Sequence, residues 1–147
     1  MTDEAGFIVK QLPGSHRDLV DGPFTAVLST VMPDGQPQTT PIWCNSKDGF
    51  VLVNTMKGFR KERNMRRNPR VALLIYDPGN PLRNIEIRGI VVEMTEDGAG
   101  EHLDELTRLY LARPNAKFFA DCVAAELRST FVPVRVVIAP THVRTEG

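Results

Sequence analysis

Hydrophobic and polar positions along this chain alternate in short runs rather than in long helical stretches. Apolar runs rich in β-branched residues, each bounded by Pro, Gly, Asn or Asp, are typical of strands. Tight-turn sequences such as Pro33-Asp34-Gly35 and Asp48-Gly49 join neighbouring runs, so a mainly antiparallel sheet is expected. The pattern predicts six strands, at residues 24–31, 37–45, 50–55, 70–77, 83–94 and 130–138.

Helical patterns occupy two clearer segments and two weaker ones. Residues 60–67 are rich in good helix formers and end before Pro69, which predicts a two-turn helix. Residues 99–112 place leucines at helical spacing, with acidic residues early and an arginine late, as the helix dipole favours. A short helix is expected within 15–20 and a further helix within 116–128.

The order of these elements predicts a fold that is mainly β. Short, strongly twisted antiparallel strands close readily into a small barrel, which removes free edges. Pro41 removes one donor from the second strand and places it at an edge or a bulge, and Gly89 predicts a bulge or a bend in the fifth. We therefore expect residues 1–147 to form a single domain, a six-stranded antiparallel split β-barrel with flanking helices.

Composition and charge exclude several classes of protein. Lys plus Arg and Asp plus Glu both total 18, and this zero net charge argues against a dedicated duplex-DNA binder. Two cysteines cannot form a disulfide framework, and no apolar run approaches the ~18 residues of a membrane span. The N-terminus is acidic before it is apolar, the wrong order for a signal peptide. A cytoplasmic protein without membrane or nucleic-acid partners is expected.

The zero net charge conceals a strongly basic segment, residues 57–70. A helix here places Arg60, Arg63 and Arg67 on one side and Lys61 near its start. Basic side chains and helix N-terminal amides together make an anion site, and a phosphate monoester is its natural occupant. Two other interpretations are a solvated basic helix face and an RNA-binding surface. The low aromatic content, 7%, weighs against RNA binding because base stacking needs aromatic rings.

The same region resembles a known family. Residues 48–76 contain, in order, the hairpin Asp-Gly, an apolar strand that ends in Asn-Thr, an Arg-Lys pair, and Asn-Pro-Arg before a second apolar strand. This order is similar to the core of the pyridoxamine 5′-phosphate oxidase-like split β-barrel, a fold that binds flavins or deazaflavins. Upstream, residues 34–37 and 40–43 are similar to the first hairpin of that superfamily. The small deazaflavin (F-420)-dependent branch shares the pattern closely.

The resemblance implies a set of cofactor-binding positions. In the family, the Arg-Lys pair binds the cofactor phosphate, and the end of the third strand lies along the phosphate and the ribityl chain. The backbone of the second strand follows the edge of the isoalloxazine ring, and a polar residue of the fifth strand bonds the ring or tail, often from the other subunit. Carried over residue by residue, these positions are Arg60, Lys61, Arg63, Asn54, Thr55, Thr40, Pro41, Ile42, Trp43 and Asn84.

Two departures from the family pattern narrow the expected activity. The vitamin B6 oxidase binds its substrate phosphate through a C-terminal Trp and Arg motif, whereas Trp43 is the single tryptophan here, so that activity is not expected. Phe59 stands two residues before Lys61, where many deazaflavin-dependent members have a basic residue. Flavin mononucleotide (FMN) therefore stays an alternative to F-420.

The resemblance thus implies a homodimeric oxidoreductase with its cofactor groove at the interface. Such a protein would transfer a hydride to a small, flat organic acceptor, and the cofactor would supply the reactivity. The alternatives are an FMN-binding relative of pyridoxamine 5′-phosphate oxidase and a cofactor carrier or sensor without turnover. No catalytic side chain is assigned, and no metal site is expected because His16, His102 and His142 lack a ligand spacing.

Overall fold

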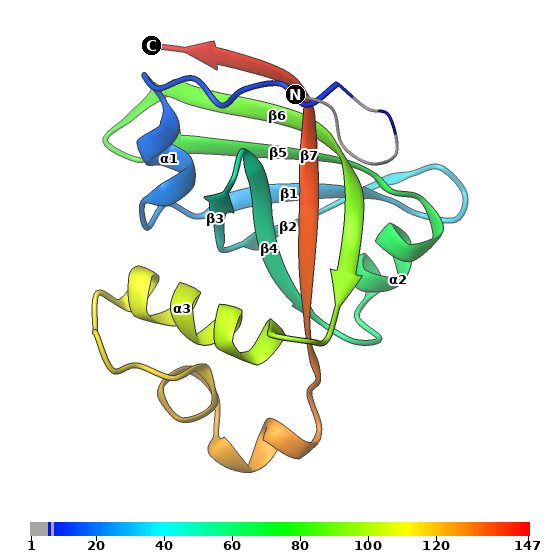
Figure 1. Ribbon diagram of the computed structural model, residues 1–147, viewed down its shortest axis with the longest axis vertical. Coiled ribbons are helices and arrows are strands. Elements are labelled where there is room, and N and C mark those ends of the chain that lie inside the picture. Colours follow the sequence, from blue (N-terminus) through cyan, green and yellow to red (C-terminus); the bar gives the residue numbers. More distant parts are fainter. Residues whose placement is uncertain (1–5, 7) are drawn as a thin grey trace.

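In the computed structural model, which describes residue 6 and residues 8–147, the chain folds around one antiparallel sheet of seven strands. The sheet curls into a half-barrel with helices at its sides and end (Figure 1). Its strand order is β2-β1-β5-β6-β7-β4-β3. The strands are β1 (Ala26–Val31), β2 (Pro37–Ile42), β3 (Cys44–Lys47), β4 (Phe50–Met56), β5 (Arg70–Asp77), β6 (Asn80–Thr95) and β7 (Pro133–Glu146).

The prediction of six strands and a closed barrel is wrong at one point, the strand expected over 37–45. The chain bends at Trp43, so this stretch forms two strands, β2 and β3, which are the two edges of the sheet. Among the described residues no ladder joins these edges, and the barrel is not closed. The edge position predicted for the strand that contains Pro41 is confirmed, because an edge strand tolerates a missing donor.

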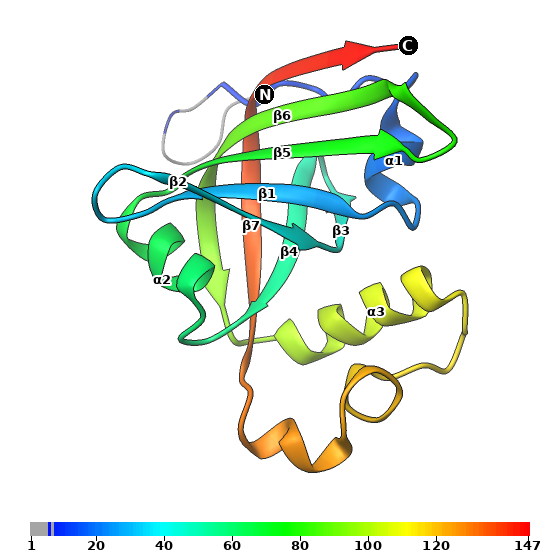
Figure 2. The same ribbon diagram turned by 180° about the vertical axis from the view of Figure 1, so that it is seen from behind.

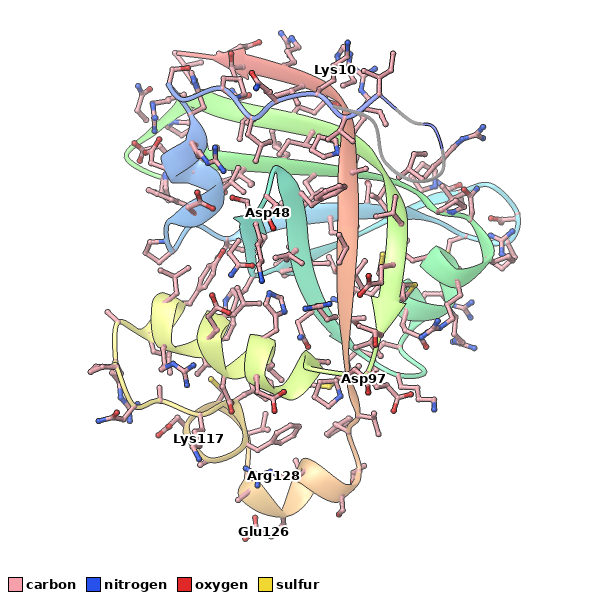
Figure 3. The ribbon with its side chains drawn as sticks, in the orientation of Figure 1. Lys10, Asp48, Asp97, Lys117, Glu126 and Arg128 are labelled. Atoms are coloured by element: carbon pink, nitrogen blue, oxygen red, sulfur yellow. The ribbon has the colours of Figure 1, made fainter. Side chains whose placement is uncertain are left out.

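Three α-helices flank the sheet: α1 (Arg17–Asp21), α2 (Arg60–Arg67) and α3 (Ala99–Leu111). The helix predicted over 116–128 is instead two short turns, η1 (Phe118–Cys122) and η2 (Ala125–Ser129), with non-helical backbone angles inside η1. This segment lies beyond α3, and Glu126 and Arg128 lie at its far end (Figure 3). No helix of the described residues is both long and apolar enough to cross a bilayer.

The prediction for the last strand, 130–138 followed by a polar tail, is too short. β7 continues to Glu146 because residues 142–146 pair with residues 84–88 of β6, beyond a register shift between Arg88 and Gly89. The bulge or bend predicted at Gly89 corresponds to this register shift, in which the unmatched residue, Thr141, lies on β7. A Cβ atom at Gly89 would lie only 2.6 Å from the backbone oxygen of Ala139, so only glycine allows the two strands to approach.

The core fills the concave side of the curled sheet. Alternate residues of β1 and β5 point inward, and Met65 of α2 and Leu19 of α1 pack against them. A second, smaller cluster joins Met56 at the end of β4 with Leu103 of α3 and Phe119. The two clusters hold α2 and α3 at the open end of the half-barrel (Figure 1).

Candidate functional site

A groove opens at this end of the half-barrel, between β4, the first turn of α2, α3 and the bend that joins β2 to β3. Its volume is about 390 Å³, within the range of small-molecule sites. It is lined by Thr25, Pro41, Ile42, Trp43, Asn54, Thr55, Met56, Phe59, Lys61, Leu103, Leu106 and Phe118. The structure therefore brings together six of the predicted site residues, which are Pro41, Ile42, Trp43, Asn54, Thr55 and Lys61.

One end of the groove is cationic because of Lys61. Its ammonium Nζ donates a hydrogen bond to Thr40 Oγ1 at 3.1 Å, so a further predicted residue contacts the site. Burial lowers the pKa of Lys61 from its usual value. Among the described residues Lys61 has no carboxylate partner. A half-buried cation without a counter-ion is electrostatically costly, and a bound anion would relieve that cost.

The first turn of α2 adds to this positive end. The N-cap residue, Phe59, supplies no side-chain acceptor to the free amides of that turn. Arg60 is partly buried and Arg63 is exposed, and neither makes an ion pair within the described part of the chain. Neither lines the groove itself; both lie on the helix that starts at its edge.

Three other bases of the 57–70 segment, Lys57, Arg66 and Arg67, are already occupied. Lys57 pairs with Glu96 at 3.1 Å, and Arg66 pairs with the buried Glu62. Arg67 donates to the backbone oxygen of Val31 at 3.1 Å. The basic segment is therefore not one uniform face, because its unpaired charges include those nearest the groove.

An aromatic wall forms the opposite side of the groove. The ring of Trp43 stacks on Tyr110 of α3 with centroids 5.0 Å apart and planes at 15°, and Phe118 meets Trp43 edge-on at 6.4 Å. The Tyr110 hydroxyl accepts the Cys44 amide hydrogen at 3.0 Å and donates to the Phe24 carbonyl at 2.8 Å. Burial raises the pKa of Tyr110, so the hydroxyl stays neutral and holds the bend on which Trp43 sits.

Two residues of the groove lining carry a buried polar atom without a partner, Asn54 Oδ1 and Thr55 Oγ1. The other branch of the Asn54 amide is used, because Nδ2 donates to the Ala99 carbonyl at 3.0 Å and to His102 Nδ1 at 3.1 Å. Buried polar atoms are nearly always satisfied in folded proteins, so two unpaired atoms in neighbouring residues of the groove lining point to a ligand. The cationic end, the flat aromatic wall and these two atoms fit a phosphate-bearing planar molecule with hydroxyl groups.

His102 lies behind the groove and is neutral. Burial, with a smaller contribution from the charge of Arg135, lowers the pKa of His102 to about 4. Its Nε2 bonds Asn45 Oδ1 at 2.9 Å, on the side away from Asn54. Among the described residues no cluster of three or more His, Cys, Asp or Glu side chains is placed to hold a metal.

One predicted residue lies elsewhere. Asn84 is near the start of β6, where it pairs with Tyr76 and Glu146 in the sheet, and its Nδ2 donates to the carbonyl of Leu82 at 3.3 Å. It is not part of the groove of its own chain.

Sequence reasoning also missed residues that the structure adds to the site. The additions are Thr25, Met56, Phe59, Leu103, Leu106 and Phe118 in the lining, with Tyr110 and His102 behind it. Those on α3 have a leucine-and-aromatic pattern that predicts only a packed helix face. No spacing in the sequence links them to β2 or β4.

Comparison with known proteins identifies what the chain is similar to. The family model described as Pyridoxamine 5′-phosphate oxidase matches residues 12–145. A curated pyridoxine/pyridoxamine 5′-phosphate oxidase from Rubrobacter xylanophilus is 38% identical over 77 residues, which are 51% of this chain and 35% of that protein. The match thus spans about a third of the length of that relative.

Solved structures extend the likeness over nearly the whole chain. An F420 reductase superposes with a TM-score of 0.75 at 29% identity and covers 90% of this chain and 98% of its own. A conserved hypothetical protein from Mycobacterium tuberculosis superposes with a TM-score of 0.67 at 26% identity and covers 94% of this chain and 86% of its own.

Proposed function

Since the chain belongs to the pyridoxamine 5′-phosphate oxidase family, we propose that it is an oxidoreductase whose groove binds the deazaflavin coenzyme F-420 or FMN. One observation carries the proposal. The half-buried Lys61, which has no carboxylate partner among the described residues, lines the same aromatic-walled groove as Asn54 and Thr55, each of which has a buried, unpaired polar atom. Each of these features is unfavourable in an empty protein, and a phosphate-bearing planar cofactor would satisfy all of them.

The residues of the groove would divide the binding between them. Lys61, Arg60 and the first turn of α2 would hold the phosphate, with Arg63 in support. The bend at Pro41, Ile42 and Trp43 would provide the wall for the ring. Once bound, the cofactor supplies hydride transfer to a small, flat acceptor. The chain would orient the two rings and exclude water, which is a large part of what such a reaction requires.

The residues that line the groove are consistent with a chain that binds and orients while the cofactor supplies the reactivity. The lining contains no Asp, Glu or His, so among the described residues Lys61 is its single ionisable side chain. A reaction that needs a carboxylate or imidazole acid would find none there. The same lining also suits a carrier that holds the cofactor without turnover. Faster reoxidation of the bound, reduced cofactor on addition of acceptors would exclude a carrier.

Between the two cofactors, F-420 is the first candidate. The similarity to an F420 reductase covers almost all of both chains, whereas the match to the vitamin B6 oxidase covers a third of that enzyme. FMN stays the alternative because Phe59 lines the groove where a basic residue is common in the deazaflavin branch. A pyridoxamine 5′-phosphate oxidase activity is disfavoured by the single tryptophan, Trp43.

We also propose that the protein is a homodimer with the groove at its interface. Register places Pro41 of β2, Val27 of β1 and Leu74 of β5 in one row on the outer side of the sheet. Leu74 and Tyr76 are each 40% exposed. This apolar row leads to the groove, because Pro41 also lines it. A second copy on this row would cover the open side of the groove and bring its Asn84 toward the cofactor.

The test is a spectrum followed by two titrations. The absorbance spectrum of the purified protein shows whether a flavin or deazaflavin is retained. Titration of the cofactor-free protein with FMN and with F-420, under matched conditions, then gives both dissociation constants. We expect saturable binding of at least one cofactor with a stoichiometry of one per chain. The absence of binding for both would contradict the proposal, and sedimentation analysis tests the dimer separately.

A further inference from the structure

Asn54 and His102 form a small polar chain that runs from the groove into the protein. Asn54 lies in β4 and is anchored on α3 by two contacts of its Nδ2, to the Ala99 carbonyl at 3.0 Å and to His102 Nδ1 at 3.1 Å. On its other side, His102 Nε2 contacts Asn45 Oδ1 of β3 at 2.9 Å. The chain therefore joins β4, α3 and β3.

Donor and acceptor roles in this chain are fixed by chemistry. An amide nitrogen only donates, so His102 Nδ1 must accept from Asn54 Nδ2 and carry no proton. The hydrogen of the neutral ring then sits on Nε2 and is donated to Asn45 Oδ1. With both nitrogens engaged, His102 has no capacity left for a ligand. Its place in the chain explains why a buried histidine at this point of α3 can stay neutral.

The orientation of the Asn54 amide follows from this arrangement. A flipped amide would place Oδ1 against the Ala99 carbonyl oxygen, so that two acceptors would meet at hydrogen-bond distance. The observed orientation instead leaves Oδ1 buried and unpaired in a residue that lines the groove. Asn54 thus carries a buried, unpaired acceptor beside the groove, and contacts with α3 set its direction.

We propose that His102 is a positioning residue that fixes the Asn54 amide, so that Oδ1 accepts a hydrogen bond from a hydroxyl group of the bound cofactor. The inference rests on the proposed function, because it assigns a role within the same groove. It predicts that His102 affects binding only through Asn54. A residue that merely filled space would affect binding independently of Asn54.

A double-mutant cycle separates these two cases. Dissociation constants for FMN and for F-420 are measured for the wild type, Asn54→Ala, His102→Leu and the double variant. Loss of one hydrogen bond predicts a roughly tenfold weaker affinity for each single variant. Because both changes remove the same contact, the double variant should be no weaker than the Asn54→Ala variant. His102→Asn, which can place an acceptor near the position of Nδ1, should recover most of the affinity.

Several results would overturn the inference. One is a wild-type affinity in the folded His102→Leu variant; another is a double variant whose loss is the product of the two single losses. A tautomer measurement on the ligand-free protein covers the case in which His102→Leu fails to fold. Nitrogen NMR shifts should show a protonated Nε2 and an unprotonated Nδ1, and the reverse tautomer would refute the proposed geometry. If the wild type binds neither cofactor, the proposed function fails first and this inference fails with it.

Discussion

The groove and a depression on the outer side of the sheet are both hollow and both basic, but they differ in how their charges are held. The outer depression has a volume of about 480 Å³ (the outer side faces the viewer in Figure 2). It is lined by Ser29, Thr30, Val31, Pro37, Arg70, Val71, Ala72, Arg88, Gly89, Ile90 and Thr141. If only volume and the number of basic residues counted, the depression would be a better anion site than the groove.

Burial and pairing reverse that ranking. In the depression, Arg70 and Arg88 are exposed, and Arg88 is paired with Glu86 at 3.2 Å. In the groove, Lys61 is half-buried without a carboxylate partner. The groove also holds Asn54 Oδ1 and Thr55 Oγ1, whereas the depression has no unpaired buried side-chain atom among the described residues. The comparison teaches that unsatisfied, desolvated groups distinguish a ligand site better than the number of charges does.

The largest effect is expected when the cationic end of the groove is removed. Arg60→Ala combined with Lys61→Ala should weaken cofactor binding at least about 100-fold, because two charge-assisted contacts to the phosphate are lost. The protein should stay folded, because neither side chain is fully buried and neither is part of the apolar core. The matched control, Arg70→Ala with Arg88→Ala, removes the same charge from the outer depression and should change affinity less than about twofold. Equal losses in both pairs, measured by titration, would refute the distinction between the two regions.

The next largest effect concerns the pH dependence of stability. The folded protein holds the pKa of His102 at about 4, whereas an unfolded histidine titrates near ~6.5. As the pH falls, the histidine of the unfolded chain therefore binds a proton before His102 of the folded protein does. The contribution of neutral His102 to the free energy of unfolding is complete above pH ~6.5 and is lost as the pH falls toward about 4. At ~1.4 kcal/mol per unit, the loss in the free energy of unfolding reaches up to about 3 kcal/mol.

Urea denaturation at a series of pH values measures this loss. The His102→Asn variant cannot titrate there, so its stability should fall less steeply over the same range. Any dependence of unfolding free energy on pH that remains in the variant comes from carboxylates and other titratable groups. Parallel curves for the wild type and the variant would show that His102 is not held neutral.

A smaller loss of stability is expected from Tyr110→Phe. The change keeps the stacked ring but leaves the Cys44 amide without its acceptor at the bend of the groove, which should cost about 1–2 kcal/mol of unfolding free energy. Cofactor affinity should fall as well, because Trp43 sits on that bend. The protein has one other tyrosine, the exposed Tyr76, and Tyr76→Phe is the control for which no loss is expected. If chemical denaturation gives the same unfolding free energy for the two variants, the role assigned to Tyr110 is wrong.

The smallest expected effect is on the melting temperature of a Lys61 variant, and there the direction of the change matters more than its size. Burial lowers the pKa of Lys61, so its charge is unfavourable in the ligand-free protein. Lys61→Met should therefore leave the melting temperature unchanged or slightly raised while it impairs cofactor binding. Arg63→Met, at an exposed position of the same helix, is the comparison for the melting temperature. A clear drop for Lys61→Met would mean that the lysine stabilises the fold and is not held ready for an anion.

Local sequence patterns predicted those features of the fold that depend on residues close together in the chain. The bounds of α2 and of β5 agree with the predictions because a proline and adjacent turns determine them. The length of β7 could not be predicted, because residues 142–146 become a strand only by pairing with residues 84–88 of β6, more than fifty positions earlier in the chain. The same limit applies to the site. Lys61 and Asn54 lie within one continuous motif, whereas Tyr110 reaches Cys44 across 66 positions.

The central claim is that the phosphate of a cofactor lies at Lys61 and Arg60, and one measurement tests it directly. The affinities of FMN and riboflavin are compared in the wild type and in the variant that combines Arg60→Ala with Lys61→Ala; F-420 and its chromophore without the phosphate-bearing tail are compared in the same way. The account predicts that the wild type prefers the phosphate-bearing form of its cofactor by at least about 100-fold, and that the variant loses this preference while it keeps the weak affinity for the bare ring. An equal preference in both proteins would contradict it, because the phosphate would then be held elsewhere.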